Sequence, residues 1–136
     1  MRDESREALM EFLSHRETLI GDIEEDARGM LGVIPFIFGP MKERPDLFIL
    51  SALGDYLACR PPGMDPKTAE LVAVAAAACY GSPDCLKVHI RAALQEGATH
   101  DELRDVLLIS ALIGKTKVLA LAFRTLGEVE GKDAGR

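Results

Sequence analysis

Apolar side chains recur along most of the chain at intervals of three to four residues, the spacing that places them on one face of an α-helix. Between about residues 3 and 30, charged and polar residues separate an apolar series that stops before Gly29 and Gly32. This stretch predicts one long amphipathic first helix. Its apolar positions are Leu9, Phe12, Leu13, Leu19, Ile20 and Ile23.

Prolines mark the boundaries of the next elements. The stretch "GVIPFIFGP" contains Pro35 and Pro40 and therefore permits at most a short helical turn. A second clear helix is expected to begin after Pro45 and to stop at "RPPG", which contains Pro61. We expect this helix to have about three turns.

The two following helices have well-marked starts and stops. Asp65 and Ser82 are each followed by a proline, and an N-cap residue before a proline at the first helical position is typical of a helix start. Gly81 and Gly97 follow the two apolar stretches and are expected to end them. We therefore predict an alanine-rich helix from 66 to 80 and another from 83 to 96.

A capping box, Thr99 to Glu102, opens a fifth helix that is expected to run to about Ile113. A sixth is expected from Lys115 to about Val129, before a polar tail, about 130–136, that should be frayed. Strand-like alternation of polar and apolar residues is missing from the sequence. We therefore predict an all-α fold, a single-domain six-helix bundle over residues 1–136.

Composition supports one domain and predicts an assembly. The chain has 136 residues, of which 48% are apolar, and it contains no Trp. A core of this kind must be built mainly from Ala, Leu, Val and Ile, which favours close helix packing. Six short helices with this much aliphatic surface leave apolar faces that one small core cannot cover, so we expect a homo-oligomer.

Charge and patterning disfavour two classes of partner. The formal net charge is −6, which offers no basic surface for a nucleic-acid backbone. The start "MRDESREALM" is charged, and the longest apolar runs, near 71–80 and 106–114, are far shorter than the roughly 18 residues that a membrane span needs. We therefore expect a cytoplasmic protein with neither a nucleic-acid nor a membrane partner.

Cys85 and His89 form the first candidate site. If Ser82 caps the helix, Cys85 lies in its first turn, where the helix dipole favours a thiolate, and His89 lies four residues later on the same face. A thiol beside an imidazole is a plausible activated nucleophile, although the charge of Asp84 opposes thiolate formation. The alternative is a buried core cysteine beside a half-exposed histidine, since such pairs also arise by chance.

Glu70 is the second candidate, because its helix face is otherwise formed by small and apolar residues. A carboxylate in that seam is costly without a partner. If the helices on either side of Gly81 form an antiparallel hairpin, Glu70, Cys85 and His89 can converge in one cavity. The alternative is that Glu70 lies in solvent at the edge of the helix.

The other thiols receive weaker assignments. Cys79 comes nine residues after Glu70 and points to nearly the opposite side of the helix, so we expect it in the core. Cys59, at the end of a helix, is assigned no role. Cys79, Cys85 and His89 provide only three ligands at unsuitable spacing for zinc, so neither a metal nor another cofactor is expected. Three cysteines without a secretory signal predict reduced core thiols or a reactive thiol rather than a disulfide framework.

The stretch "AELVAVAAAACYGSPDCLKVHIRAALQEGATHDEL" closely resembles the core of the carboxymuconolactone decarboxylase and alkylhydroperoxidase D-like superfamily. Its redox members carry a glutamate, a C-x-x-C motif that begins twelve residues later, and a histidine four residues after the second cysteine. Glu70, Ser82, Cys85 and His89 fall on these spacings. With the upstream "GVIPFIFGPMKERPDLF", the likeness extends over about 32–122.

The resemblance implies an all-helical homo-oligomer, commonly a trimer or a hexamer. It also implies a peroxiredoxin-like thiol reaction in which Cys85 attacks a peroxide or a disulfide while His89 and Glu70 move protons. Ser82 stands where the family has its first cysteine, which puts the intramolecular dithiol cycle in doubt. Cys79 as a substitute partner, or an external thiol reductant, could then resolve oxidised Cys85.

Three functions follow from this resemblance. The first is an antioxidant, thiol-dependent hydroperoxidase or disulfide reductase that uses Cys85, His89 and Glu70. The second is a lactone decarboxylase that uses His89 and Glu70 without a dithiol. The third is a non-catalytic oligomeric relative.

Overall fold

The computed structural model describes residues 1–131, and helices are the regular secondary structure over that range, with no strand. It confirms the all-α prediction but contains seven helices in the described residues, so the six-helix bundle is not reproduced in detail. Of the tail that was predicted to be frayed, about 130–136, residues 132–136 lie outside the described residues. The elements are α1 (Asp3–Ser14), α2 (Arg16–Leu31), α3 (Phe38–Met41), α4 (Pro45–Cys59), α5 (Pro66–Tyr80), α6 (Pro83–Gln95) and α7 (His100–Val129).

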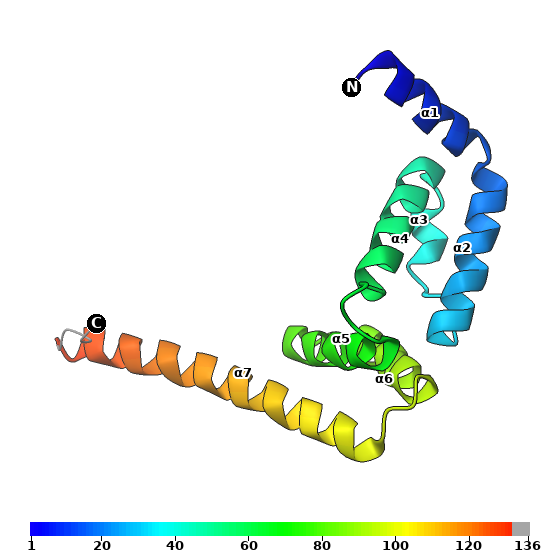
Figure 1. Cartoon of the computed structure of the whole chain (residues 1–136). Helices are drawn as coiled ribbons and strands as arrows, with labels where there is room; N and C mark the ends of the chain where they lie inside the picture. The colour runs from blue at the N-terminus through cyan, green and yellow to red at the C-terminus, as the bar shows by residue number, and fades with distance from the viewer. Residues whose placement is uncertain (132–136) are drawn as a thin grey trace.

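The predicted first helix is divided in two at His15, which adopts φ −88° and ψ 22°. The hydroxyl of Ser14 donates a hydrogen bond of 2.6 Å to the carbonyl of Glu11. A serine that bonds the backbone in this way competes with regular helical pairing. Figure 1 shows α1 turned away from α2 at this point.

At the C-terminal end the sequence predicted a break that the structure does not contain. The predicted fifth and sixth helices are one continuous helix, α7. The expected break lay at Gly114. A glycine in a helix interior costs only about 1 kcal/mol relative to alanine, and neither a proline nor a capping residue accompanies it. The capping box that opens α7 is present as predicted, with Thr99 and Glu102 bonded reciprocally.

Two apolar clusters hold helices α2 to α6 and the start of α7 together. In the first, α5 packs against α6 and the start of α7 around Val74, Ala93 and Leu103. In the second, α2 and α3 pack against α4 around the buried Phe48 and Ile49. Figure 1 shows the α5–α6 hairpin lying across the lower ends of α2 and α4, so the region between the two clusters is bounded by helices from both halves of the chain.

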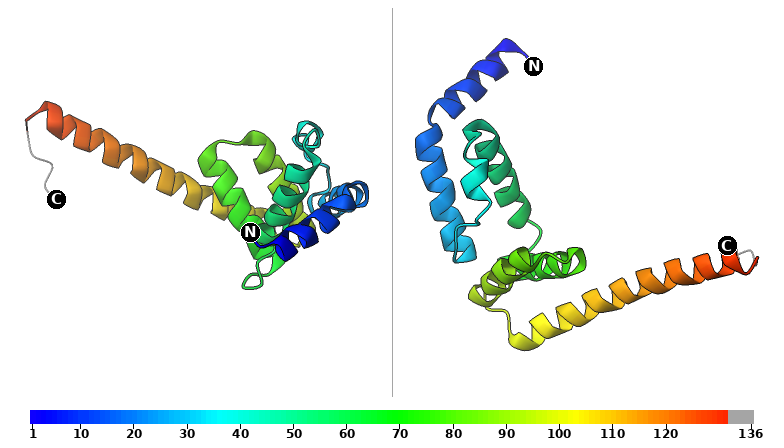
Figure 2. Two further views of the ribbon diagram at one scale, coloured as in Figure 1. Left: turned by 90° about the horizontal axis from the view of Figure 1, so that it is seen from above. Right: turned by 180° about the vertical axis from the view of Figure 1, so that it is seen from behind.

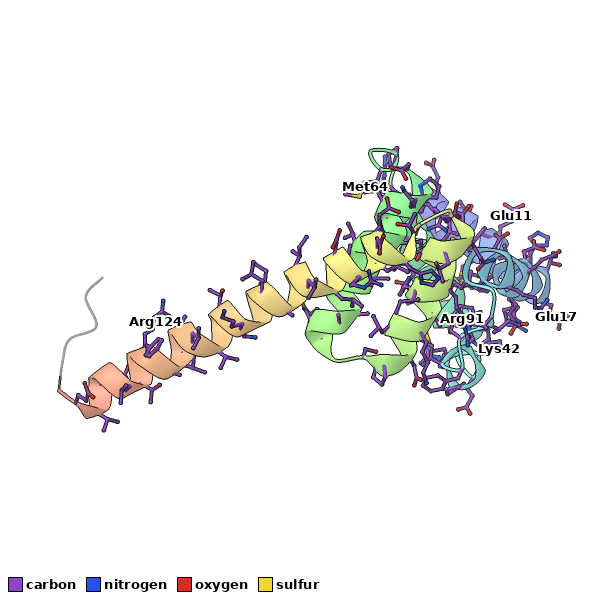
Figure 3. The ribbon with its side chains drawn as sticks, turned by 90° about the horizontal axis from the view of Figure 1, so that it is seen from below. Glu11, Glu17, Lys42, Met64, Arg91 and Arg124 are labelled. Atoms are coloured by element: carbon purple, nitrogen blue, oxygen red, sulfur yellow. The ribbon has the colours of Figure 1, made fainter. Side chains whose placement is uncertain are left out.

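Most of α7 leaves this body. Both views in Figure 2 show it projecting away from the other helices, and Arg124, labelled in Figure 3, lies on the projecting part. An 18-residue window of this helix is only 6% buried and, by length and composition, is apolar enough to cross a membrane. The expectation that every apolar segment is too short for this was wrong, because the break expected at Gly114 does not occur.

Candidate functional site

Glu70 lies in the second turn of α5, on the face that also buries Val74 and Ala77. Its side chain is 1% exposed, so the solvent-exposed alternative is wrong. A carboxylate buried to this degree requires hydrogen bonds or opposite charges to offset its lost hydration. Two side chains, from α6 and from the end of α4, provide them.

His89 is the first partner of Glu70. Its Nδ1 lies 2.8 Å from Glu70 Oε2, and its side chain is 20% exposed. The contact forms because Gly81, at φ +67°, turns the chain so that α5 and α6 pack as a hairpin. The structure therefore contains the hairpin and the Glu70–His89 pairing that the sequence predicted.

Arg60 is the second partner of Glu70, and sequence reasoning did not identify it. Its Nη1 donates to Glu70 Oε1 at 2.6 Å and to the Cys59 carbonyl at 2.9 Å. Its Nη2 lies 3.4 Å from Glu96 Oε1. The one available signal was general: an acidic residue on a buried face requires a cation, and Arg60 lies in the short connection before the helix that carries Glu70.

These contacts decide the charge of Glu70. Burial acts to raise the pKa of its carboxyl group, but hydrogen bonds from His89 and Arg60 and their positive charges outweigh burial, so the pKa lies below its ordinary value. Glu70 is therefore an anion at neutral pH. Because an ionised carboxylate only accepts hydrogen bonds, His89 Nδ1 is the donor in this pair.

A cavity of about 600 Å³ lies beside this network. It is bounded by α2, the 33–37 segment, α4 and α6, and most of its walls are apolar, with Ile34, Phe36 and Leu53 among them. Cys85 and His89 both line it. The cavity thus brings the candidate thiol and the candidate base to one space, whereas Glu70 supports His89 from behind.

Cys85 occupies the first turn of α6, as predicted, and it is exposed. The alternative of a buried core cysteine is therefore wrong. In the part of the chain that the structure describes, no hydrogen bond joins Cys85 to His89 or to Glu70. Of these three residues, His89 and Glu70 are the two that a hydrogen bond joins in the described part of the chain.

Ser82 occupies the N-cap position of α6, but its side chain makes no capping hydrogen bond. The expected capping role of its hydroxyl was therefore wrong. Its backbone carbonyl still accepts a hydrogen bond from the Leu86 N–H at 2.9 Å. The start of α6 is consequently held by backbone contacts and by Pro83 at the first helical position.

The locations of Cys79 and Cys59 differ from those that the sequence suggested. Cys79 is exposed rather than in the core, and its Sγ lies 3.9 Å from the carbonyl of Ser110 on α7, away from the cavity. Cys59, which was assigned no role, is half-buried and lines the cavity with Cys85. Burial, followed by the negative charge of Glu70, raises the pKa of the Cys59 thiol.

The site has the form of an acid–histidine pair that faces a cavity. With Nδ1 bonded to a fixed carboxylate, the imidazole is held in one orientation, and Nε2 remains as the nitrogen that can accept a proton. Glu70 also stabilises the imidazolium that forms. Over residues 1–131, no group of three or more His, Cys, Asp or Glu side chains could hold a metal ion.

Comparison with known families gives this site its context. The family described as "Carboxymuconolactone decarboxylase family" matches residues 49–127, which is more than half of the chain and contains all the residues of the network and both cavity cysteines. Comparisons with curated proteins and with solved structures gave no match. The resemblance seen in the sequence is confirmed, and the chain belongs to the carboxymuconolactone decarboxylase family.

Proposed function

We propose that this protein is a thiol-dependent hydroperoxidase of the alkylhydroperoxidase D-like type, with Cys85 as its nucleophile. One observation carries the proposal: Cys85 opens on the same cavity as His89, whose imidazole is held by the buried Glu70 carboxylate at 2.8 Å. A thiol becomes a good nucleophile when a base removes its proton. Family membership supports this chemistry without distinguishing it from lactone decarboxylation.

The first step uses each residue in a separate role. His89 Nε2 accepts the thiol proton of Cys85, and the thiolate attacks one oxygen of the hydroperoxide. The O–O bond breaks, an alcohol leaves with the proton from His89, and Cys85 becomes a sulfenic acid. Glu70 remains charged and holds the imidazole, because its bond to Arg60 at 2.6 Å makes it a better orienting anion than a proton carrier.

The cavity supports an organic substrate. A space of about 600 Å³ with mainly apolar walls suits a hydroperoxide with a hydrocarbon body, since apolar ligands gain from leaving water. Turnover then requires an external thiol or dithiol as the reductant. A disulfide in place of the peroxide would react with the same thiolate.

The test is consumption of an alkyl hydroperoxide in the presence of a thiol donor. We expect Cys85→Ser to abolish turnover, and His89→Gln to lower kcat strongly because the base is removed. Cys79→Ser is the matched control, since Cys79 is also an exposed thiol but lies away from the cavity. Turnover that persists in Cys85→Ser would contradict the proposal.

Lactone decarboxylation is the second candidate, and one observation favours it. The Arg60–Glu70–His89 network is formed without a contribution from any thiol side chain, so proton chemistry at His89 does not require Cys85. Release of CO2 from a carboxylated lactone by both the wild type and Cys85→Ser would establish this function. Inactivity in both assays would favour a non-catalytic relative.

A further inference from the structure

Cys59 is a second thiol on the cavity of the proposed active site. It is the last residue of α4, it is half-buried, and its side chain lines the same cavity as Cys85 and His89. In sequence it is separated from Cys85 by the whole of α5. The tertiary fold therefore places two cysteines at one site where the family motif, interrupted by Ser82, supplies only one.

The contacts of Arg60 fix the position of Cys59 relative to the site. The guanidinium holds the carbonyl of Cys59 at 2.9 Å and Glu70 at 2.6 Å, and Glu70 holds His89 at 2.8 Å. His89 lies one helical turn after Cys85 on α6. A continuous set of hydrogen bonds thus ties the end of α4 to the second turn of α6.

The Cys85 side of the cavity is the less restrained one. The side chain of Ser82 makes no capping bond at the start of α6, and nothing packs within 4 Å of the Cβ position of Gly81. Pro83, Asp84 and Cys85 are all exposed in that first turn, and movement of the turn changes the position of Cys85. A disulfide between Cys59 and Cys85 requires their Cα atoms to lie within about 7 Å.

Cys79 does not have these properties. Its Sγ contacts the Ser110 carbonyl on α7 at 3.9 Å, and it is not among the residues that line the cavity. A disulfide between Cys79 and Cys85 would require the turn between α5 and α6 to reorganise. Of the two cysteines that could pair with Cys85, the structure favours Cys59.

We propose that Cys59 is the resolving cysteine of this protein. Its thiol forms an intramolecular disulfide with oxidised Cys85 across the cavity. The proposal rests on the peroxidase function proposed above. Cys85 first reacts with the hydroperoxide to give a sulfenic acid and an alcohol. The sulfur of Cys59 then attacks the sulfur of Cys85, the S–O bond breaks, and the hydroxyl leaves as water with the proton of the Cys59 thiol. An external dithiol reduces the disulfide and restores both thiols.

The environments of the two thiols suit this division of roles. Cys85 lies at a helix N-terminus beside His89, whereas burial and the charge of Glu70 raise the pKa of the Cys59 thiol. A protonated thiol reacts slowly with peroxide. Cys59 therefore stays reduced until Cys85 has been oxidised, and the sulfenic acid then provides the electrophile.

The test treats the reduced, full-length protein with one equivalent of an alkyl hydroperoxide and no reductant. Cysteine states are read by mass spectrometry of non-reduced peptides, with dimedone present in a parallel sample to trap sulfenic acid. In the wild type we expect peptides joined through Cys59 and Cys85 within one chain. In Cys59→Ser we expect severalfold more trapped sulfenic acid at Cys85, whereas Cys79→Ser should behave like the wild type.

Several outcomes would overturn the proposal. One is a disulfide between Cys79 and Cys85, and another is equal trapping of sulfenic acid in the wild type and in Cys59→Ser. A separate sample oxidised with diamide, which couples thiols without a peroxide step, distinguishes the two proposals. If diamide joins Cys59 to Cys85 but peroxide leaves Cys85 unchanged, the pairing stands and the peroxidase function is wrong; if diamide also fails to join them, the pairing is wrong.

Discussion

Glu70 shows how a single residue can organise a site from a buried position. Its carboxylate is 1% exposed and lies between Arg60 and His89. Removing one partner of such a network leaves the others with uncompensated charge, which is far more costly than losing an exposed ion pair. The same contacts that support the proposed base therefore also stabilise the fold.

The substitution Glu70→Gln tests this stabilising role. We expect it to lower the free energy of unfolding by about 3–5 kcal/mol, because Arg60 loses its buried counter-charge. Urea unfolding followed by circular dichroism measures the change. Glu102→Gln is the control, since Glu102 also bonds a lysine, Lys67, but at the protein surface, and it should cost much less.

The pH dependence of this stabilisation follows from the direction of the Glu70 shift. Because its pKa in the folded protein lies below the ordinary value of 4.5, its contribution is complete above that pH and is lost as the pH falls through the folded value. The difference in unfolding free energy between wild type and Glu70→Gln should therefore shrink below about pH 4.5. For Glu102, whose pKa is lowered to about 2, the contribution should decline progressively from about pH 4.5 and be lost near pH 2. A difference for Glu70 that grows on acidification would contradict this assignment.

Reactivity of the thiols provides a second test at the residue scale. Cys79 and Cys85 are both exposed, so accessibility alone predicts similar rates of alkylation by iodoacetamide. We expect a faster reaction at Cys85 near neutral pH, because Cys85 shares its cavity with His89, an imidazole that can accept the proton of the thiol. Rates measured against pH should lose this fast phase in Cys85→Ser and slow in His89→Gln.

The control for this measurement is Cys79→Ser, which should keep the fast phase. If the phase disappears with Cys79, or if no thiol reacts faster than a free cysteine, Cys85 is not activated. The redox proposal would then be wrong, and proton chemistry at His89 would be the remaining catalytic candidate.

At the scale of elements, glycines at two helix positions have opposite roles. Gly114 lies inside the continuous helix α7 with no atom within 4 Å of a Cβ at its position, whereas Gly81 ends α5 at φ +67°. Alanine is favoured over glycine in a helix interior but is strained at positive φ. The two positions therefore distinguish a continuous helix from a turn.

We expect Gly114→Ala to raise the free energy of unfolding by roughly 0.5–1 kcal/mol. Gly81→Ala should lower it by a similar amount or more, because alanine does not readily adopt the conformation that closes the α5–α6 hairpin. Thermal or urea unfolding of the two variants measures both effects. Destabilisation by Gly114→Ala would indicate a break in the helix at that position, as the sequence pattern first indicated.

The whole molecule exposes far more surface than a compact protein of its size. Its accessible surface is 9938 Å², whereas a folded monomer of 14.8 kDa has about 7,000 Å². The excess of about 3,000 Å² on one chain is large enough to supply the roughly 1,000–2,500 Å² that each partner contributes to an obligate interface. Exposed apolar side chains on α7 account for part of it, including Leu112, Ile113, Val118, Leu121 and Phe123.

We propose that copies of this chain cover the projecting part of α7, so that the protein is a homo-oligomer; a trimer or hexamer is the expected form. Sedimentation at micromolar concentration should show a species larger than the 14.8 kDa chain. The double variant Leu112→Glu and Val118→Glu should shift it toward the monomer, because charges in an apolar interface are costly. A monomeric wild type would contradict the proposal, and flotation with lipid vesicles would instead indicate that a bilayer covers this helix.

Local sequence determined the helices and most of their boundaries. Asp65 and the Thr99–Glu102 pair cap the helices that they were expected to cap, because capping depends on groups within one turn of each other. The Glu70–His89 pairing was also predictable, since a single short turn joins their helices and the hydrophobic pattern fixes which faces meet. The break at His15 and the continuity of α7 through Gly114 were not predictable, because small energy differences decide whether a helix continues through a weak helix-breaking residue.

Only the tertiary structure decided which distant groups complete the site. Arg60 and Cys59 reach it from the end of α4, and Cys79 is separated from it by the direction of its helix face. These relations depend on how the α2–α4 unit packs against the α5–α6 hairpin, which no local pattern specifies. Spacing along one helix therefore identified His89 and Cys85, whereas the cation that keeps Glu70 charged and the second thiol of the cavity followed from packing between helices.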